Sequence, residues 1–151
     1  MKRIVVILML VALDIGVKRW MDARLDLDEV IQVIPGWLEW NLLYNEGISG
    51  GRLRSVSWVI IPMQVIIISC IFLWWSVPHH SKRLLRNAAF ILVLSGGIGN
   101  FIDRLFLGHV IDFIHIEGRS GIFNIADLYI LFGFIGLAVW TYTSSEDPEY
   151  S

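Results

Sequence analysis

Four apolar runs divide the chain, at about residues 4–18, 57–77, 87–103 and 124–142, and charged or turn-forming residues separate them. The second and fourth reach the roughly 20 residues that a helix needs to cross a bilayer, and the other two approach this length with their flanks. A segment in lipid must satisfy its own backbone hydrogen bonds, so the many β-branched residues in these runs do not argue for strands. The pattern predicts four transmembrane helices in a single membrane domain covering residues 1–151.

Two of the connecting segments carry a different pattern. Residues 30–44 mix apolar and polar positions around Pro35-Gly36, and residues 109–117 are rich in β-branched and aromatic side chains before a turn at Gly118. Runs of this kind, bounded by Gly and Pro, are typical of strands. We expect them to pair into a small sheet at one end of the helices.

Positive charges indicate the orientation in the membrane. Lys2 and Arg3 precede the first run, and the short loop at residues 78–86 holds Lys82, Arg83 and Arg86 but no acid. Cytoplasmic loops carry such an excess of basic residues, which places both chain termini in the cytoplasm and the strand segments on the outer side.

The composition agrees with a membrane protein. Hydrophobic residues make up 56% of the chain and charged residues 17%, with a formal net charge of −2. This charge argues against nucleic-acid binding, which needs a basic surface. The one cysteine, Cys70, lies in an apolar run and leaves no possibility of a disulfide within the chain.

Ionisable and amide side chains gather at the outer ends of the predicted helices, where they are costly and often functional. Asp14 and Lys18 have the i, i+4 spacing of an ion pair. The remaining members come from the third and fourth runs and the segment between them: Asn100, Asp103, Arg104, Asp112, Asn124 and Asp127. The predicted topology brings all of them to the same membrane face.

Asp112 and Asp127 are the candidate catalytic pair among these acids. Asp14 has Lys18 at helical spacing and Asp103 is followed by Arg104, and a neighbouring cation holds a carboxylate in its ionised, structural form. Asp112 and Asp127 have no cation at such spacing. Two facing carboxylates share a proton, so one can act as general base and the other as general acid. The structural alternatives are a helix-dipole partner for Asp127 and a solvated loop acid for Asp112.

Other functions compatible with the residues are a small transporter or channel subunit, with the acids as a proton path, and a scaffold that packs through Gly96, Gly97 and Gly99. His109 and His115 lie close to Asp112 in the sequence. Neither the His-x-x-x-His spacing of a helical metal site nor cysteine ligands accompany them, so no metal or cofactor is predicted.

The chain resembles the bacterial lipoprotein signal peptidase (signal peptidase II) family. The matching blocks occur in the family's order and are Asp14-Ile15-Gly16-Val17-Lys18, Asn45-Glu46-Gly47, Gly96-Gly97-Ile98-Gly99-Asn100-Phe101-Ile102-Asp103-Arg104, Gly108-His109-Val110-Ile111-Asp112-Phe113 and Phe123-Asn124-Ile125-Ala126-Asp127. The chain departs from the family at Ile48-Ser49-Gly50-Gly51, and its spacing of 15 residues between Asp112 and Asp127 looks short for the family.

The resemblance implies four transmembrane helices, with both termini inside, and a small extracytoplasmic β-sheet cradle. It implies a membrane aspartic endopeptidase that cuts prolipoproteins on the amino side of the lipid-modified cysteine, with Asp112 and Asp127 as catalytic residues. The residues that it implies for substrate binding or support of the site are Asp14, Lys18, Asn45, Gly47, Asn100, Asp103, Arg104 and Asn124. The implied partners are a prolipoprotein with a diacylglyceryl cysteine and membrane lipid. We expect a monomer in the bacterial cytoplasmic (inner) membrane, with its active site near the outer face.

Overall fold

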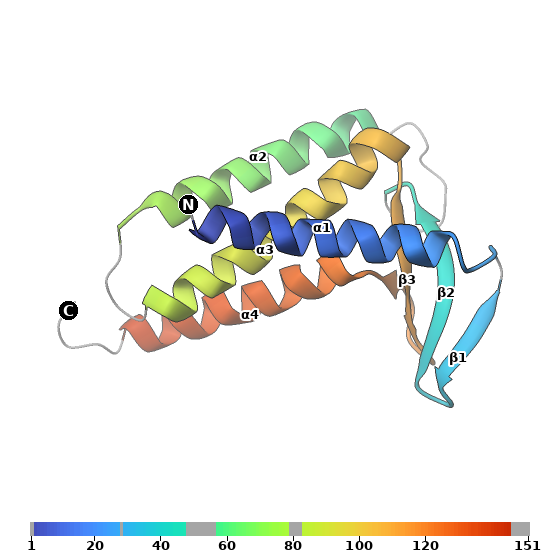
Figure 1. The fold of residues 1–151 in the computed structure, drawn as a ribbon. Helices are drawn as coiled ribbons and strands as arrows, with labels where there is room; N and C mark the ends of the chain where they lie inside the picture. Colours follow the sequence, from blue (N-terminus) through green and yellow to red (C-terminus); the bar gives the residue numbers. More distant parts are fainter. Residues whose placement is uncertain (1, 28, 48–56, 79–82, 146–151) are drawn as a thin grey trace.

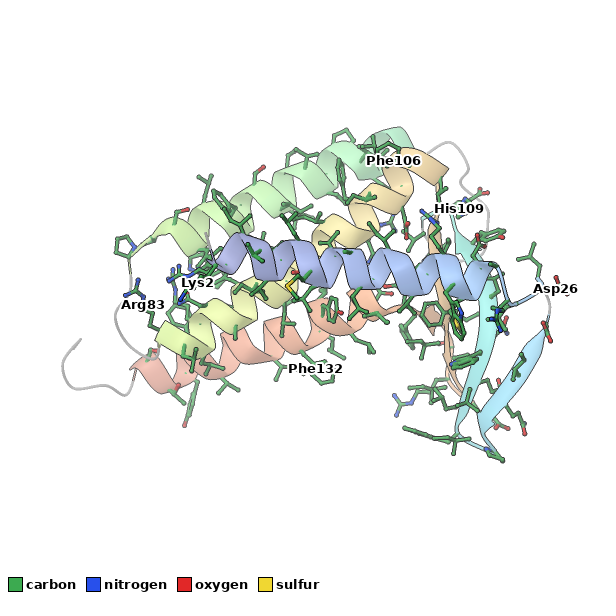
Figure 2. The ribbon with its side chains drawn as sticks, in the orientation of Figure 1. Lys2, Asp26, Arg83, Phe106, His109 and Phe132 are labelled. Atoms are coloured by element: carbon green, nitrogen blue, oxygen red, sulfur yellow. The ribbon has the colours of Figure 1, made fainter. Side chains whose placement is uncertain are left out.

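The computed structural model describes residues 2–27, 29–47, 57–78 and 83–145, which form four helices and a small sheet (Figure 1). The helices are α1 (Lys2–Asp22), α2 (Ser57–Ser76), α3 (Arg83–Leu107) and α4 (Ile125–Ser145). They lie side by side, and the sheet covers one end of the bundle. Lys2 and Arg83 lie at the end away from the sheet, whereas Asp26 and His109 lie at the sheet end (Figure 2).

The sheet contains β1 (Val30–Ile34), β2 (Leu38–Asn45), β3 (Val110–Ile116) and β4 (Ile122–Phe123), in that spatial order and with antiparallel neighbours. The turn between β1 and β2 contains Gly36, whose φ of +74° favours glycine. β2 and β3 pair in a register that sets Leu43 opposite Asp112. The expectation that two distant segments pair into one small sheet is therefore confirmed.

Three of the described helices are long and apolar enough to cross a membrane: Val59–Ser76 in α2, Arg83–Leu107 in α3 and Ile125–Ser144 in α4. α1 is long enough, but its sequence carries six charged residues. Its buried positions follow one helical face: Ile7, Val11, Asp14, Lys18 and Met21. The inward face of α1 thus places Asp14 and Lys18 between apolar residues, and its membrane span stays a prediction.

α3 occupies the centre of the bundle and contacts each of the other helices. Phe90 is fully buried there among Ala89, Val93, Leu137 and Trp140. A Cβ added at Gly133 of α4 would lie 2.5 Å from Val93 Cγ2 and 2.9 Å from the Ala89 carbonyl oxygen. The close approach of α3 and α4 therefore depends on a residue without a side chain at this crossing.

Candidate active site

The amino end of α4 is closed by a reciprocal pair of hydrogen bonds between Asn124 and Asp127. The backbone N–H of Asp127 donates to Asn124 Oδ1 at 2.9 Å, and the backbone N–H of Asn124 donates to Asp127 Oδ2 at 3.2 Å. This is the arrangement of a capping box, in which the first and fourth residues satisfy each other's backbone. Asp127 therefore supports the helix end, as the structural alternative for this residue expected, and its position is fixed by that contact.

Asp112 lies on β3 beside this helix end and is 1% exposed. Its Oδ1 accepts a hydrogen bond from Asn124 Nδ2 at 2.6 Å, and its Oδ2 accepts one from Asn45 Nδ2 at 2.8 Å. Burial raises the pKa of Asp112 to about 6; the nearby charge of Asp127 acts in the same direction, whereas the two amide donors oppose it. Asp112 is thus not a solvated loop acid, and its proton affinity is suited to chemistry near neutral pH.

Asn100 of α3 connects Asp127 to the interior of the bundle. Its Nδ2 donates to Asp127 Oδ1 at 2.8 Å, while its Oδ1 accepts from Lys18 Nζ at 2.8 Å. Because an ammonium group can only donate, Lys18 fixes which end of the Asn100 amide faces the carboxylate. Asn124 Nδ2 also reaches Asn100 Oδ1, at 3.2 Å, so the two amides form a bridge between Asp112 and Asp127.

Lys18 is the centre of a buried charge cluster. Its Nζ forms ion pairs with Asp14 Oδ2 at 2.8 Å and Asp103 Oδ2 at 3.0 Å, and none of the three side chains is exposed. Arg19, which the sequence did not single out, forms a second ion pair with Asp103 at 3.0 Å. Asp14 Oδ1 accepts from the backbone N–H of Ala126 at 2.9 Å. The cluster therefore fastens α1 and α3 to the first turn of α4, next to Asp127.

Two glycines make room for this arrangement. A Cβ at Gly99 would lie 2.5 Å from Asp14 Oδ2, and one at Gly96 would lie 2.3 Å from the Ala126 carbonyl oxygen. In the loop after β2, the backbone N–H of Gly47 donates to Asn45 Oδ1 at 3.0 Å and so orients the amide that reaches Asp112. Gly47 has a φ of +108°, a conformation that other residues adopt only with strain.

Arg104 changes the electrostatic picture drawn from sequence spacing. It is half-buried, and its charge acts on Asp112, Asp127 and Asp103 through space. Among the described residues its Nε has no hydrogen-bond partner. The sequence predicted that a neighbouring cation distinguishes the structural acids from the candidate catalytic pair. This prediction holds for Asp14. It is incomplete for the candidate pair, because the fold brings Arg104, which belongs to another element, near both carboxyl groups. The partners of Asp103 are Lys18 and Arg19.

A largely apolar pocket opens beside Asp127. Its volume is about 550 Å³, and the residues that line it are Ile116, Arg119, Phe123, Asp127, Leu128, Ile130, Leu131 and Phe134. One carboxylate of the pair thus meets a space that is wide enough for an apolar ligand and open to the surroundings. No sequence motif predicted this pocket, because the apolar residues that line it are typical of any membrane helix.

The two histidines near Asp112 have other neighbours. The ring of His109 lies against Tyr44 with centroids 4.5 Å apart, and His115 Nδ1 contacts Glu39 Oε2 at 2.9 Å. Within the described ranges, no cluster of three His, Cys, Asp or Glu residues could hold a metal ion. The departure at Ile48-Ser49-Gly50-Gly51 lies outside the described residues.

Comparison with known proteins gives concordant matches over most of the chain. Residues 6–143 match a family model described as signal peptidase (SPase) II. A lipoprotein signal peptidase of Streptococcus thermophilus is 37% identical over 132 residues, which cover 87% of this chain and 86% of the relative. One from Streptococcus pyogenes is 37% identical over 134 residues and 88% of each chain.

Two solved structures resemble the fold of this chain. A bacterial membrane enzyme determined by the in meso method at 2.3 Å resolution superposes with a TM-score of 0.81 at 27% identity, covering 97% of this chain and 92% of the other. A second structure with the same description, at 1.9 Å resolution, also gives a TM-score of 0.81, at 26% identity and 91% and 90% coverage.

Proposed function

The chain belongs to the signal peptidase II family, whose members remove signal peptides from prolipoproteins, and we propose that it cleaves these substrates as an aspartic endopeptidase through Asp112 and Asp127. The observation that carries the proposal is the bridge of two amides, Asn100 and Asn124, which links two carboxyl groups from different elements. Nothing in helix capping alone requires the second carboxyl group, Asp112, to be buried at this place.

We assign the shared proton to Asp112 at rest and the role of base to Asp127. Asp112 is buried and its pKa is raised to about 6, so it keeps its proton up to a higher pH than an ordinary aspartate does. Asp127 is half-buried, lines the open pocket and lies in the first turn of α4, where the helix dipole favours a negative charge. Water entering from the pocket therefore reaches the carboxylate that is placed to take its proton.

The proposed reaction has two steps. Asp127 takes a proton from water as the water oxygen attacks the scissile carbonyl carbon, and Asp112 gives its proton to the carbonyl oxygen, which yields a neutral gem-diol. Asp127 then donates its proton to the leaving nitrogen while Asp112 takes one back from a hydroxyl of the gem-diol, and the C–N bond breaks. Arg104, whose charge acts on both carboxyl groups, is our candidate for stabilising the developing negative charge.

The apolar pocket supports a lipid-bearing substrate. We propose that it accommodates apolar parts of a prolipoprotein whose cysteine carries a diacylglyceryl group, so that the bond on the amino side of this cysteine meets Asp127. Replacing the exposed Leu131 by Trp would fill the pocket from the α4 side without disturbing the core. We expect Leu131→Trp to raise KM for a lipidated precursor with little change in kcat, since the carboxyl pair is untouched.

The proposal also includes a place in the cell. The protein is a multi-pass bacterial membrane protein, and we propose that it resides in the cytoplasmic membrane as a monomer with the sheet and the carboxyl pair at the outer face. The basic residues Lys2, Arg3, Arg83 and Arg86 at the opposite end of the bundle support this orientation by the positive-inside rule.

The test is to replace Asp112 or Asp127 by Asn in separate variants and to assay cleavage of a lipidated precursor by the purified full-length protein. Asn preserves size and most hydrogen bonds but cannot exchange a proton, so we expect activity to fall by at least about a hundredfold in each variant. Asp26→Asn, an exposed acid at the same end of the molecule, is the matched control and should cleave normally. Substantial activity in either variant, with normal folding, would remove that residue from the mechanism.

A further inference from the structure

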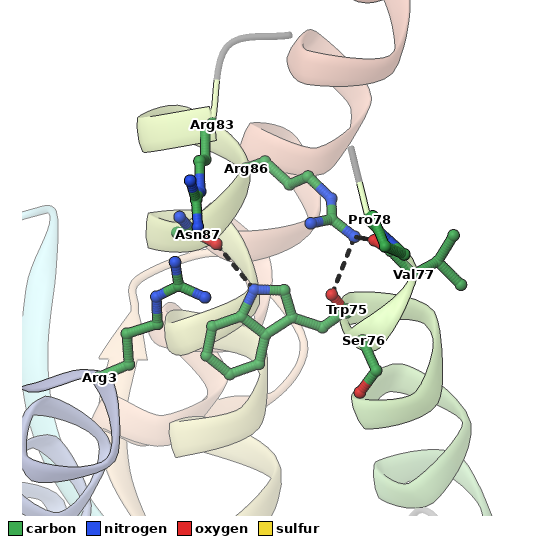
Figure 3. Close-up of a pocket in the computed structure, with 8 residues that line it drawn as sticks. All are labelled: Arg3, Trp75, Ser76, Val77, Pro78, Arg83, Arg86 and Asn87. Carbon is green, nitrogen blue, oxygen red and sulfur yellow. Dashed lines mark hydrogen bonds between the residues drawn. The ribbon is translucent and has the colours of Figure 1, made fainter. Parts of the chain in front are cut away.

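A polar pocket lies at the end of the bundle opposite the sheet. Its volume is about 250 Å³, and Arg3 of α1, Trp75 and Ser76 of α2, Val77 and Pro78 after α2, and Arg83, Arg86 and Asn87 of α3 line it. Three arginines from two helices extend into this one hollow (Figure 3). The lining residues include no acid, so the charge of the described wall is positive.

Each arginine has a distinct environment. Arg86 is 5% exposed and its Nη2 donates to the carbonyl oxygens of Trp74, Trp75 and Val77, which caps the end of α2. Its buried Nε has no hydrogen-bond partner among the described residues. Arg3 lies over the Trp75 ring at 5.5 Å, and Arg83 is exposed at the rim. Neither Arg3 nor Arg83 has a carboxylate partner in the described part of the chain, so within that part the pocket holds like charges without a counter-ion.

The polar floor of the pocket is fixed. Trp75 Nε1 donates to Asn87 Oδ1 at 2.8 Å, which holds the ring between α2 and α3 beside Arg3 (Figure 3). Arginine is the side chain best suited to phosphate, because its planar set of N–H groups matches the phosphate oxygens. A preformed hollow with several guanidinium groups and an aromatic wall is therefore suited to a phosphate anion.

An apolar groove begins next to this pocket. It has a volume of about 540 Å³ and is lined by Ile4, Ile7, Leu8, Ile68, Ser69, Phe72, Leu73, Leu94 and Ile98. Ile7 follows Arg3 by four residues on α1 and Phe72 precedes Trp75 by three on α2, so about one helical turn separates the two sets of walls. The same three helices thus offer a cationic head site and an apolar channel in succession.

We propose that these two features together bind an anionic phospholipid, with its phosphate against Arg3, Arg83 and Arg86 and one acyl chain in the groove between α1, α2 and α3. Basic pockets between helices are the usual sites for anionic lipid headgroups. The site lies at the end of the bundle remote from the carboxyl pair and does not rest on the proposed function. A free phosphate ion could bind the arginines as a lipid phosphate does, but it would not account for the apolar groove beside them.

The experiment uses the purified full-length protein in detergent and native mass spectrometry to count bound lipids. Dioleoylphosphatidylglycerol and dioleoylphosphatidylcholine are added at equal concentrations, and we expect the anionic lipid to be retained preferentially. A basic residue near a membrane surface strengthens binding of anionic lipid by about fivefold, so Arg3→Gln/Arg83→Gln should weaken retention on the order of 25-fold. Equal retention of the two lipids, or unchanged retention in the double variant, would overturn the proposal.

Arg24→Gln is the matched control, because Arg24 also lies over a tryptophan ring, that of Trp20 at 5.3 Å, but at the sheet end. We expect it to retain the anionic lipid as the parent does. Two further arms separate a lipid from free phosphate. Ser69→Trp obstructs the groove and leaves the arginines intact, so it should reduce lipid retention, and millimolar inorganic phosphate should compete poorly. Normal lipid retention in Ser69→Trp together with full displacement by phosphate would show that only the phosphate is recognised, and it would overturn the proposed acyl-chain site in the groove.

Discussion

Removing the charge of Lys18 tests the buried cluster that fastens the first turn of α4. In Lys18→Met, Asp103 keeps Arg19 at 3.0 Å, but among the described residues Asp14 keeps only the backbone N–H of Ala126. The unexposed Asp14 carboxylate would then lack its cation. Breaking a buried ion pair by removing one partner costs about 3–5 kcal/mol. For a chain of this length about 1 kcal/mol corresponds to 2–4 °C, so Tm should fall by roughly 6–20 °C.

A second variant separates the charge effect from the effect on catalysis. Asp14→Asn/Lys18→Met removes both charges, and an asparagine oxygen can still accept the Ala126 N–H. We expect this variant to recover more than half of the lost Tm. Cleavage should stay low in both variants, on the order of a hundredfold below the parent, because Asn100 loses the donor that orients its amide toward Asp127.

The assays are thermal unfolding in detergent, followed by tryptophan fluorescence, and cleavage of a lipidated precursor. Lys2→Met, which removes an exposed lysine from the same helix, is the control and should leave both measurements near parent values. A Lys18→Met protein that unfolds within about 1 °C of the parent, or a double variant as unstable as the single one, would refute the argued role of the Asp14 charge.

Four further predictions concern Asp112 and the helix packing. Because the proposed mechanism needs a proton on Asp112, whose pKa is about 6, cleavage should decline as pH rises above 6, and a rate that climbs steadily to pH 8 would contradict the assignment. The raised pKa also means that the folded state binds this proton more tightly than the unfolded chain. Stability should therefore decrease by up to about 3 kcal/mol as pH rises from 4 to 7, and denaturant unfolding of Asp112→Asn should lack this component. Asn45→Ala removes a donor that lowers the pKa of Asp112, so the alkaline decline in cleavage should move to higher pH, whereas Asn41→Ala on the same strand should leave the profile in place. Gly133→Val forces α3 and α4 apart and should cost at least 1–3 kcal/mol in thermal unfolding, while Gly16→Ala, whose added Cβ meets nothing within 4 Å, should not destabilise.

Hydrophobic patterning predicted the helical elements because a bilayer-length apolar run has few alternatives. It placed the third helix at 87–103, whereas α3 extends over Arg83–Leu107. The difference arises because arginines and exposed residues at both ends continue the helix without contributing to an apolar run. In α1 the buried face mixes apolar Ile7 and Val11 with charged Asp14 and Lys18. Neither hydropathy nor charge alone therefore predicts which residues of this helix are buried.

The site could be predicted as a set of residues but not as a network. Asp14 and Lys18 pair as their spacing indicated, since an i, i+4 contact is decided within one helix. The contact between Lys18 and Asn100 joins residues 82 positions apart, and no local rule indicates it. Arg19 and the charge of Arg104 on the carboxyl pair escaped sequence reasoning for the same reason. The apolar pocket beside Asp127 carries no motif, because its wall consists of ordinary membrane-helix residues.

The capping contacts of Asp127 bear on how the candidate catalytic pair is kept in place. A carboxylate whose Oδ2 accepts the Asn124 N–H and whose Oδ1 accepts the Asn100 amide has little freedom to rotate. Its partner Asp112 is held by Asn124 and Asn45 in the same way. Asn124 serves both acids, so a movement of the first turn of α4 would shift the two together rather than separate them. The helix cap and the candidate catalytic geometry are therefore one structure, and the structural role of Asp127 is compatible with the proposed mechanism.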